Sequence, residues 1–188
     1  MAHNQKTMQE RMLAGELYDP FDPMLVEMNF RAQELCVAFN NAPPRAVQAQ
    51  QSLLSQLFGV IGADCVIRAP FHCDYGANIF CGDRVFINHG CTILDCNTVH
   101  IGDRVLLGPN VQLYAATHPL EVDQRKEGWE FALPIEIGSD VWIGGSAVVC
   151  PGVTIGSGST IGAGSIVVKD IPAGVVAVGN PCKVVRQL

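Results

Sequence analysis

The chain has 188 residues, of which 48% are apolar and 16% charged; this excludes an intrinsically disordered protein and fits one domain of ordinary size. Its net charge of −6 and its lack of a basic run argue against a nucleic-acid surface. No apolar run reaches the length of a membrane-spanning helix, and residues 1–10 lack the pattern of a signal peptide. The eight cysteines include no C-x-x-C pair, which is typical of buried free thiols. We therefore expect a cytoplasmic protein without membrane contact.

Residues 1–60 are predicted to form a helical lid that packs against the rest of the chain. The pair Asp22-Pro23 is a helix-start signal, with Asp as the N-cap and Pro in the first turn. Apolar residues then recur at steps of three and four, as on one face of a helix. These residues are Leu25, Met28, Ala32, Leu35 and Phe39. A further helix is predicted over residues 45–58.

A repeat of six residues governs residues 61–188. In the later part, aliphatic residues recur in one phase at Ile101, Leu107, Leu113, Ile137, Ile143, Val149, Ile155, Ile161 and Val167. An earlier run has another phase, with a slip of four residues between Cys91 and Ile101; it comprises Ile61, Ile67, Cys73, Ile79, Val85 and Cys91. Six matches neither a helix nor an alternating strand, but it fits a short strand and a tight turn repeated, as in a parallel β-helix. We predict a mainly β protein whose interior holds columns of these side chains.

Residues 114–134 are predicted to be a looped excursion from this repeat. The polar run from Gln124 to Gly128 cannot line an apolar column, and long loops on rigid scaffolds often carry function. Thr117-His118-Pro119 lies at the base of the loop. Among the five histidines, only His118 stands at this junction. It is a candidate general base, although a surface histidine in a turn before proline would look the same.

The hexads from Ile137 to Pro172 resemble those of the hexapeptide-repeat acyltransferases. Within them the chain is similar to the maltose and galactoside O-acetyltransferase group, close to nodulation acetyltransferases. Its specific marks are Ala14-Gly15-Glu16-Leu17-Tyr18, Cys73-Asp74-Tyr75-Gly76, Ala116-Thr117-His118-Pro119 and Gly179-Asn180-Pro181. The resemblance covers nearly the whole chain. It implies a left-handed parallel β-helix, a homotrimer with active sites between subunits, and acetyl-CoA as the donor.

The resemblance also implies roles in the chemistry. A sugar hydroxyl needs a base as it attacks the thioester carbonyl, and His118 matches the catalytic histidine of the family. Glu130 matches a residue that would hold the other ring nitrogen, but an exposed loop carboxylate is an equal alternative. Asn88 matches a residue that contacts the acceptor and stabilises the transition state. Its alternative role is that of a turn residue in the β-helix.

Candidate acceptor-binding residues are largely carboxylates, which accept hydrogen bonds from sugar hydroxyls. Asp74 matches an acceptor-binding position, and Asp95 lies in a Leu-Asp motif. Cys96 stands where galactoside enzymes carry a second Asp, which weighs against a galactoside-specific enzyme. Asp22 reaches the acceptor or serves only as the helix cap. Tyr18 stacks on a sugar ring or packs in the core.

The donor is expected to bind along the later coils. By resemblance, backbone amides hold the pantetheine arm and cations lie near the phosphates, although a solvated C-terminal tail would carry the same charges. Trp142 packs on pantetheine or shapes the outer surface. The cofactor-binding set is Trp142, Gly145, Ala163, Val168, Lys169, Lys183 and Arg186.

We therefore expect an acetyl-CoA-dependent O-acetyltransferase that acts directly on a hydroxyl of a maltose-, glucose- or galactoside-like sugar and needs no metal. Two alternatives remain. A non-catalytic solenoid scaffold has no need of the Thr-His-Pro loop. A metal-dependent carbonic anhydrase on a similar fold requires several histidines around zinc, and no third histidine follows His100 and His118 in this region.

Overall fold

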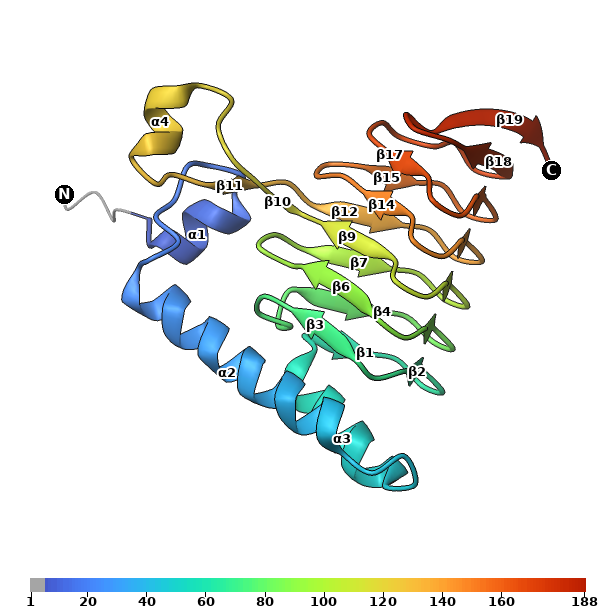
Figure 1. Cartoon of the computed structure of the whole chain (residues 1–188), viewed down its shortest axis with the longest axis horizontal. Helices are drawn as coiled ribbons and strands as arrows, with labels where there is room; N and C mark the ends of the chain where they lie inside the picture. Colours follow the sequence, from blue (N-terminus) through green and yellow to red (C-terminus); the bar gives the residue numbers. More distant parts are fainter. Residues whose placement is uncertain (1–5) are drawn as a thin grey trace.

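The structure, a computed structural model, describes residues 6–188 as a group of helices followed by a coil of short strands (Figure 1). The prediction for residues 1–10 falls partly on residues 1–5, which lie outside the described residues. The coil has three flat faces, each formed by parallel strands from successive turns, and about six turns are stacked along its axis. The predicted parallel β-helix with an N-terminal helical segment is thus confirmed.

Each face of the coil is one sheet. The first face contains β1 (Val60–Ile61), β4 (Ile79–Cys81), β7 (Val99–Ile101), β12 (Ile135–Ile137) and β15 (Thr154–Ile155). The second face contains β2 (Val66–Ile67), β5 (Phe86–Ile87), β8 (Leu106–Leu107), β13 (Trp142–Ile143), β16 (Thr160–Ile161) and β18 (Val175–Val178), with β19 (Lys183–Gln187) antiparallel at its end. The third face contains β3 (Phe71–Cys73), β6 (Cys91–Leu94), β9 (Gln112–Tyr114), β14 (Val148–Val149) and β17 (Ile166–Val167).

The repeated aliphatic residues fill the interior in register. On the second face, Ile67, Ile87 and Leu107 follow one another in successive coils and are buried. The coils lie so close that some corners admit only glycine. A Cβ atom on Gly144 would lie 2.5 Å from the backbone nitrogen of Ala163 in the next coil, inside any van der Waals contact. The repeat of six therefore has two causes. Strands of successive coils pair in register on each face, and the backbones of successive coils come so close at the corners that glycine is required there.

The register of the early coils differs from the predicted one. Ile61 pairs with Cys81 and not with Ile79, and Cys81 pairs with Ile101. The steps from Cys73 to Cys81 and from Ile93 to Ile101 each hold two residues more than a hexad. The predicted single slip of four residues was wrong, because these two small insertions together account for it. Both fall between the third face and the first, at the corner where residues 114–134 also leave the coil.

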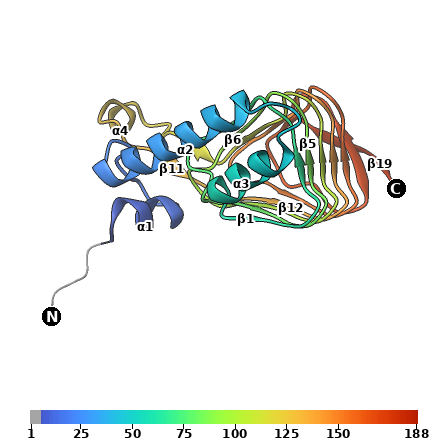
Figure 2. The same cartoon turned by 90° about the horizontal axis from the view of Figure 1, so that it is seen from below.

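The helices cover the start of the coil. They are α1 (Met8–Leu13), α2 (Pro23–Asn41) and α3 (Val47–Leu57). As predicted, the Asp22 side chain caps α2, with its Oδ1 accepting from the Met24 nitrogen at 3.0 Å. Helices α2 and α3 pack on each other and lie across the first coil (Figure 2). None of the helices within residues 6–188 is both long and apolar enough to cross a bilayer.

The predicted excursion is a hairpin with a helical tip. Its two strands, β10 (Ala116–Thr117) and β11 (Phe131–Ala132), pair antiparallel, and α4 (Val122–Lys126) lies between them. The hairpin leaves the coil beside α1 (Figure 1). Because β11 of the hairpin contacts α1, the N-terminal segment and residues 114–134 jointly border one corner of the coil.

Candidate active site

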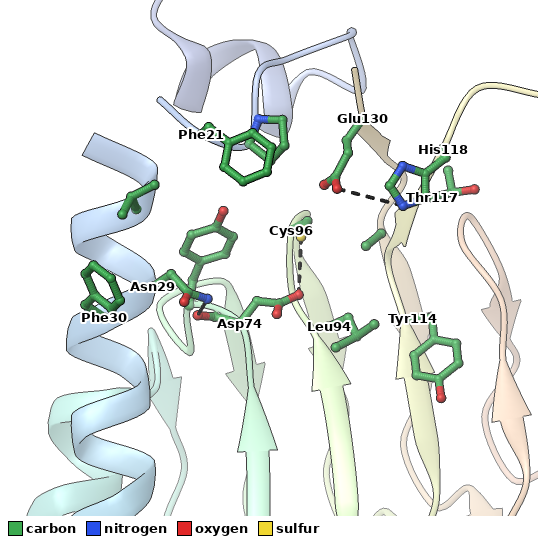
Figure 3. Close-up of a pocket in the computed structure, with 14 residues that line it drawn as sticks. Phe21, Asn29, Phe30, Asp74, Leu94, Cys96, Tyr114, Thr117, His118 and Glu130 are labelled. Carbon is green, nitrogen blue, oxygen red and sulfur yellow. Dashed lines mark hydrogen bonds and ion pairs between the residues drawn. The ribbon is translucent and has the colours of Figure 1, made fainter. Parts of the chain in front are cut away.

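A pocket of about 690 Å³ opens at the corner where the extra residues gather (Figure 3). One wall comes from the loop before α2 and from α2 itself, including Phe21, Asn29 and Phe30. The other side comes from three successive corners of the coil, each longer than a hexad. These corners contribute Asp74, Tyr75, Leu94, Cys96, Tyr114, Ala116, Thr117, His118 and Glu130. The register shifts therefore create the pocket.

His118 and Glu130 face each other at the base of the hairpin. The pairing of Thr117 with Phe131 places His118 just after one strand and Glu130 just before the other. The Nε2 atom of His118 lies 3.8 Å from Oε1 of Glu130, and the side chains are 59% and 22% exposed. That separation is longer than a hydrogen bond, although such contacts commonly shorten when substrate binds. The structure brings together these two predicted catalytic residues.

The carboxylate of Glu130 is held from the other side by Tyr18. The Tyr18 hydroxyl donates to Oε2 of Glu130 at 3.0 Å. Tyr18 is fully buried, in a cluster with Met12 and Leu25. Of the two roles considered for Tyr18, the structure supports packing in the core, because a buried ring cannot stack on a sugar. Sequence reasoning missed its contact with Glu130, since 112 residues separate the two partners.

Asp74 and Cys96 lie side by side in the pocket. The Cys96 thiol donates to Oδ2 of Asp74 at 3.3 Å. Burial raises the pKa of the Cys96 thiol, so it stays protonated and acts as donor. Burial also raises the pKa of Asp74; the bond from Cys96 opposes this rise, and the nearby charge of Glu130 adds to it. Asn29 donates to the backbone oxygen of Asp74 at 2.9 Å. Asn29, in the wall of the pocket, thus holds the main chain at Asp74 in place.

Asp95 lies beneath the pocket and does not line it. Its side chain is fully buried and accepts from the backbone nitrogens of Asp74 at 3.0 Å, Tyr75 at 2.8 Å and Asn78 at 3.2 Å. Burial raises the pKa of Asp95 to about 6, although the hydrogen bonds from the backbone of Tyr75 and Asn78 oppose the rise. The oxygens of Asp95 thus bind backbone groups below the surface of the pocket, where the carboxylate has a structural role. Asp22 also does not line the pocket; its Oδ1 caps α2.

Asn88 and the predicted cofactor residues lie elsewhere on the chain. Asn88, Gly145 and Ala163 occupy the corner between the second and third faces, whereas His118 leaves from the far end of the third face. Trp142 lies on the outside of the second face and is 55% exposed. The remaining residues, Val168, Lys169, Lys183 and Arg186, are exposed at the C-terminal end of the coil. One chain therefore does not bring Asn88 and His118 to one pocket.

The residues from 6 to 188 contain no group of three or more His, Cys, Asp and Glu side chains arranged to hold a metal ion. His100, the partner considered for His118 in a zinc site, lies outside the first face with its Nδ1 2.8 Å from Oε1 of Glu136. His100 therefore pairs with Glu136 on the outer surface of the coil and does not reach the pocket.

Comparison with known proteins places this geometry in a family. Residues 11–62 match the maltose acetyltransferase hexapeptide capping motif, and residues 134–169 match the bacterial transferase hexapeptide repeats. The galactoside O-acetyltransferase of Escherichia coli K12 is 44% identical over 181 residues, covering 96% of this chain and 89% of that protein. The chain belongs to the maltose and galactoside O-acetyltransferase group of hexapeptide-repeat acyltransferases.

Solved structures of the group have the same fold. A maltose O-acetyltransferase from Clostridium difficile 630 is similar with a TM-score of 0.97 and 43% identity, covering 98% of this chain and 99% of that one. A galactoside acetyltransferase in complex with coenzyme A has a TM-score of 0.94 and 43% identity, with 97% and 92% of the two chains covered. The protein is therefore an acyltransferase, and its group is the one indicated by the sequence motifs.

Proposed function

We propose that the protein transfers an acetyl group from acetyl-CoA to a hydroxyl of a maltose-, glucose- or galactoside-like sugar. The observation that carries this proposal is the pairing of His118 with Glu130 at the edge of a pocket that also contains Asp74. A general base with an oriented ring, next to a carboxylate that can accept from hydroxyls, is what O-acylation of a sugar needs. The coenzyme A complex of a relative supports the donor.

In the proposed mechanism, the imidazole of His118 removes the hydroxyl proton as the sugar oxygen attacks the thioester carbonyl. The carbon–oxygen bond forms, and the resulting oxyanion collapses with cleavage of the carbon–sulfur bond. The proton on His118 then passes to the departing thiolate of CoA. Glu130 holds one ring nitrogen, which leaves the other nitrogen for proton transfer. No acyl-enzyme is required, because one base serves both steps.

A homotrimer completes the proposed site. Asn88, assigned to the oxyanion, and His118 stand at opposite ends of the third face of one chain. A neighbouring subunit would bring its Asn88 corner, together with Gly145 and Ala163, to the His118 corner of the first. The mean hydropathy of +0.24 and the exposed side chains of Leu106 and Trp142 on the second face support burial of further surface between subunits.

The proposed donor site runs from this subunit boundary to the end of the coil. Backbone amides of Gly145 and Ala163 hold the pantetheine arm. Lys169, Lys183 and Arg186 supply positive charge for the phosphates of the nucleotide, and Val168 makes a main-chain contact with the donor. Arg186 lies on β19, opposite Val176 of β18. Because this antiparallel strand pair fixes the C-terminal segment, its cations are presented from an ordered element and not from a loose tail.

The proposal is tested by His118→Ala. We expect acetyl transfer to slow by roughly 10²–10⁴-fold, which is the usual value of general-base catalysis. Acetyl-CoA binding, measured by calorimetry, should hardly change, because the residues assigned to CoA lie elsewhere. Transfer is followed by thiol release across a panel of sugars, and the panel also names the acceptor. Wild-type turnover of His118→Ala on a good acceptor would refute the proposed base.

A further inference from the structure

Tyr18 and Glu130 are joined by three hydrogen bonds, although they belong to two segments that lie far apart in the sequence. The backbone nitrogen of Tyr18 donates to the oxygen of Glu130 at 2.9 Å, and the nitrogen of Glu130 donates back at 3.1 Å. These two bonds form an antiparallel bridge between single residues. The third is the side-chain bond, in which the Tyr18 hydroxyl donates to Oε2 of Glu130 at 3.0 Å.

The surroundings of Tyr18 make its hydroxyl a fixed donor. The residue is fully buried, and its ring packs in the cluster that contains Met12, Leu25, Tyr75 and Ala132. Burial, followed by the proximity of Cys96 and Glu130, raises the pKa of Tyr18 above its usual value. A tyrosine that stays neutral keeps its proton for the bond to Glu130. A buried ring with two side-chain torsions also has little freedom to move away.

Glu130, in contrast, has little else to fix its carboxylate. The terminal torsion of a glutamate side chain has a broad, roughly two-fold energy profile, so a free carboxylate turns readily. Among the described residues, the contacts that its oxygens make are the bond from Tyr18 to Oε2 and the approach of His118 to Oε1. Each carboxylate oxygen of Glu130 therefore has its own partner, and Figure 3 shows the contact with His118.

We propose that Tyr18 is a positioning residue of the acetyl-transfer reaction, because it holds Oε2 of Glu130 so that Oε1 faces His118. This inference rests on the proposed function, in which His118 is the general base. Because Tyr18 is fully buried, it acts on the reaction through Glu130 and not by contact with the acceptor or the donor. The N-terminal segment thus supplies the catalytic pair with a buried anchor in addition to a wall of the pocket.

The test is a double-mutant cycle of Tyr18→Phe and Glu130→Gln. Tyr18→Phe keeps the ring and removes only the hydroxyl. In the wild-type background we expect kcat to fall about tenfold, the effect of losing a hydrogen bond to a charged group, with KM for acetyl-CoA unchanged. In the Glu130→Gln background the same change should have almost no effect on kcat, because the carboxylate that it positions is absent.

Tyr75→Phe is the matched control. Tyr75 lies in the same buried cluster and borders the pocket, but its hydroxyl has no bond to Glu130. Any effect of Tyr75→Phe should be equal in both Glu130 backgrounds. Unfolding midpoints and light scattering of each variant set a temperature at which all of them are folded, so a loss of stability does not enter the rates.

The outcomes separate this inference from the proposed function. Wild-type kcat for Tyr18→Phe, or the same loss in both backgrounds, would overturn the role of Tyr18 while leaving the base in place. Full turnover of His118→Ala would overturn the base itself. If Tyr18→Phe lowers kcat only when Glu130 is present, and His118→Ala is inactive, both the role of Tyr18 and the proposed base are supported.

Discussion

The thiol of Cys96 donates a hydrogen bond to Oδ2 of Asp74, with 3.3 Å between sulfur and oxygen. A thiol is a weak donor, so this bond leaves the carboxylate able to accept strongly from a ligand hydroxyl. Since both side chains line the pocket, the pair is placed to influence the choice of acceptor.

Cys96→Ser should therefore change acceptor kinetics. A serine hydroxyl is a stronger donor and competes with the sugar for Asp74. We expect kcat/KM for the acceptor to fall about fivefold, which corresponds to about 1 kcal/mol for one hydrogen bond, with acetyl-CoA affinity unchanged. Cys150→Ser, outside the pocket lining, is the control. Wild-type kinetics of Cys96→Ser toward every acceptor would remove Cys96 from the site.

The proposed sharing of sites between subunits predicts complementation. His118→Ala and Asn88→Ala should each be inactive alone. When the two are co-expressed in equal amounts, mixed trimers contain some sites with an intact His118 from one subunit and an intact Asn88 from the next. We expect about a quarter of wild-type activity, from random assembly of closed rings. Activity that stays at the level of the single variants would mean that the two residues do not meet across an interface.

Asp95 should give the protein a pH-dependent stability. Its pKa in the folded state is about 6, above the value of about 3.9 in an unfolded chain. Between these values the folded state binds more protons, so the free energy of unfolding decreases as pH rises from about 4 to about 6. The loss is on the order of 2–3 kcal/mol, and it is complete above the folded pKa.

This prediction is checked by urea unfolding of the wild type and Asp95→Asn across that range. The stability difference between the two should move in favour of the wild type as pH falls. Asp140→Asn is the control with the opposite sign, because the bond from Arg104 lowers the pKa of Asp140. The advantage of the wild type over that variant should persist from about pH 6 to about pH 4 and be lost only as pH falls below about 4. A pH-independent difference for Asp95→Asn would show that Asp95 has an ordinary pKa when folded.

Local signals in the sequence predicted much of the fold. The cap at Asp22 and the apolar face from Leu25 to Phe39 located α2, because both depend on residues a few positions apart. The hexads located the strands for the same reason. The register of the early coils could not be read in this way, since Ile79 and Cys81 are both buried and only pairing between coils shows which one continues the column.

The sequence pointed to His118 and Glu130 as candidate residues, but it did not indicate the contacts that hold them. His118 and Glu130 flank a recognisable loop, and the structure brings them together. The burial of Asp95 and the bond from Tyr18 were not predicted, because both depend on segments that meet only after folding. Phe21 and Phe30 in the pocket wall likewise belong to no repeat, so nothing in the sequence pattern marked them.

The clustering of every insertion at one corner has a consequence for how such a protein changes. From each strand of the first face to the next strand of the second face, and from there to the third face, the interior residues of the pocket-forming coils stay six positions apart. Cys81 and Ile87 are one such pair, and Ile101 and Leu107 are another. Residues can therefore be added or removed at the pocket corner without shifting any interior column. The pocket proposed for the acceptor is free to vary in length and composition, while the stack of coils proposed to bind the donor stays the same. A single scaffold can in this way be adapted to new acceptors by changes to its loops alone.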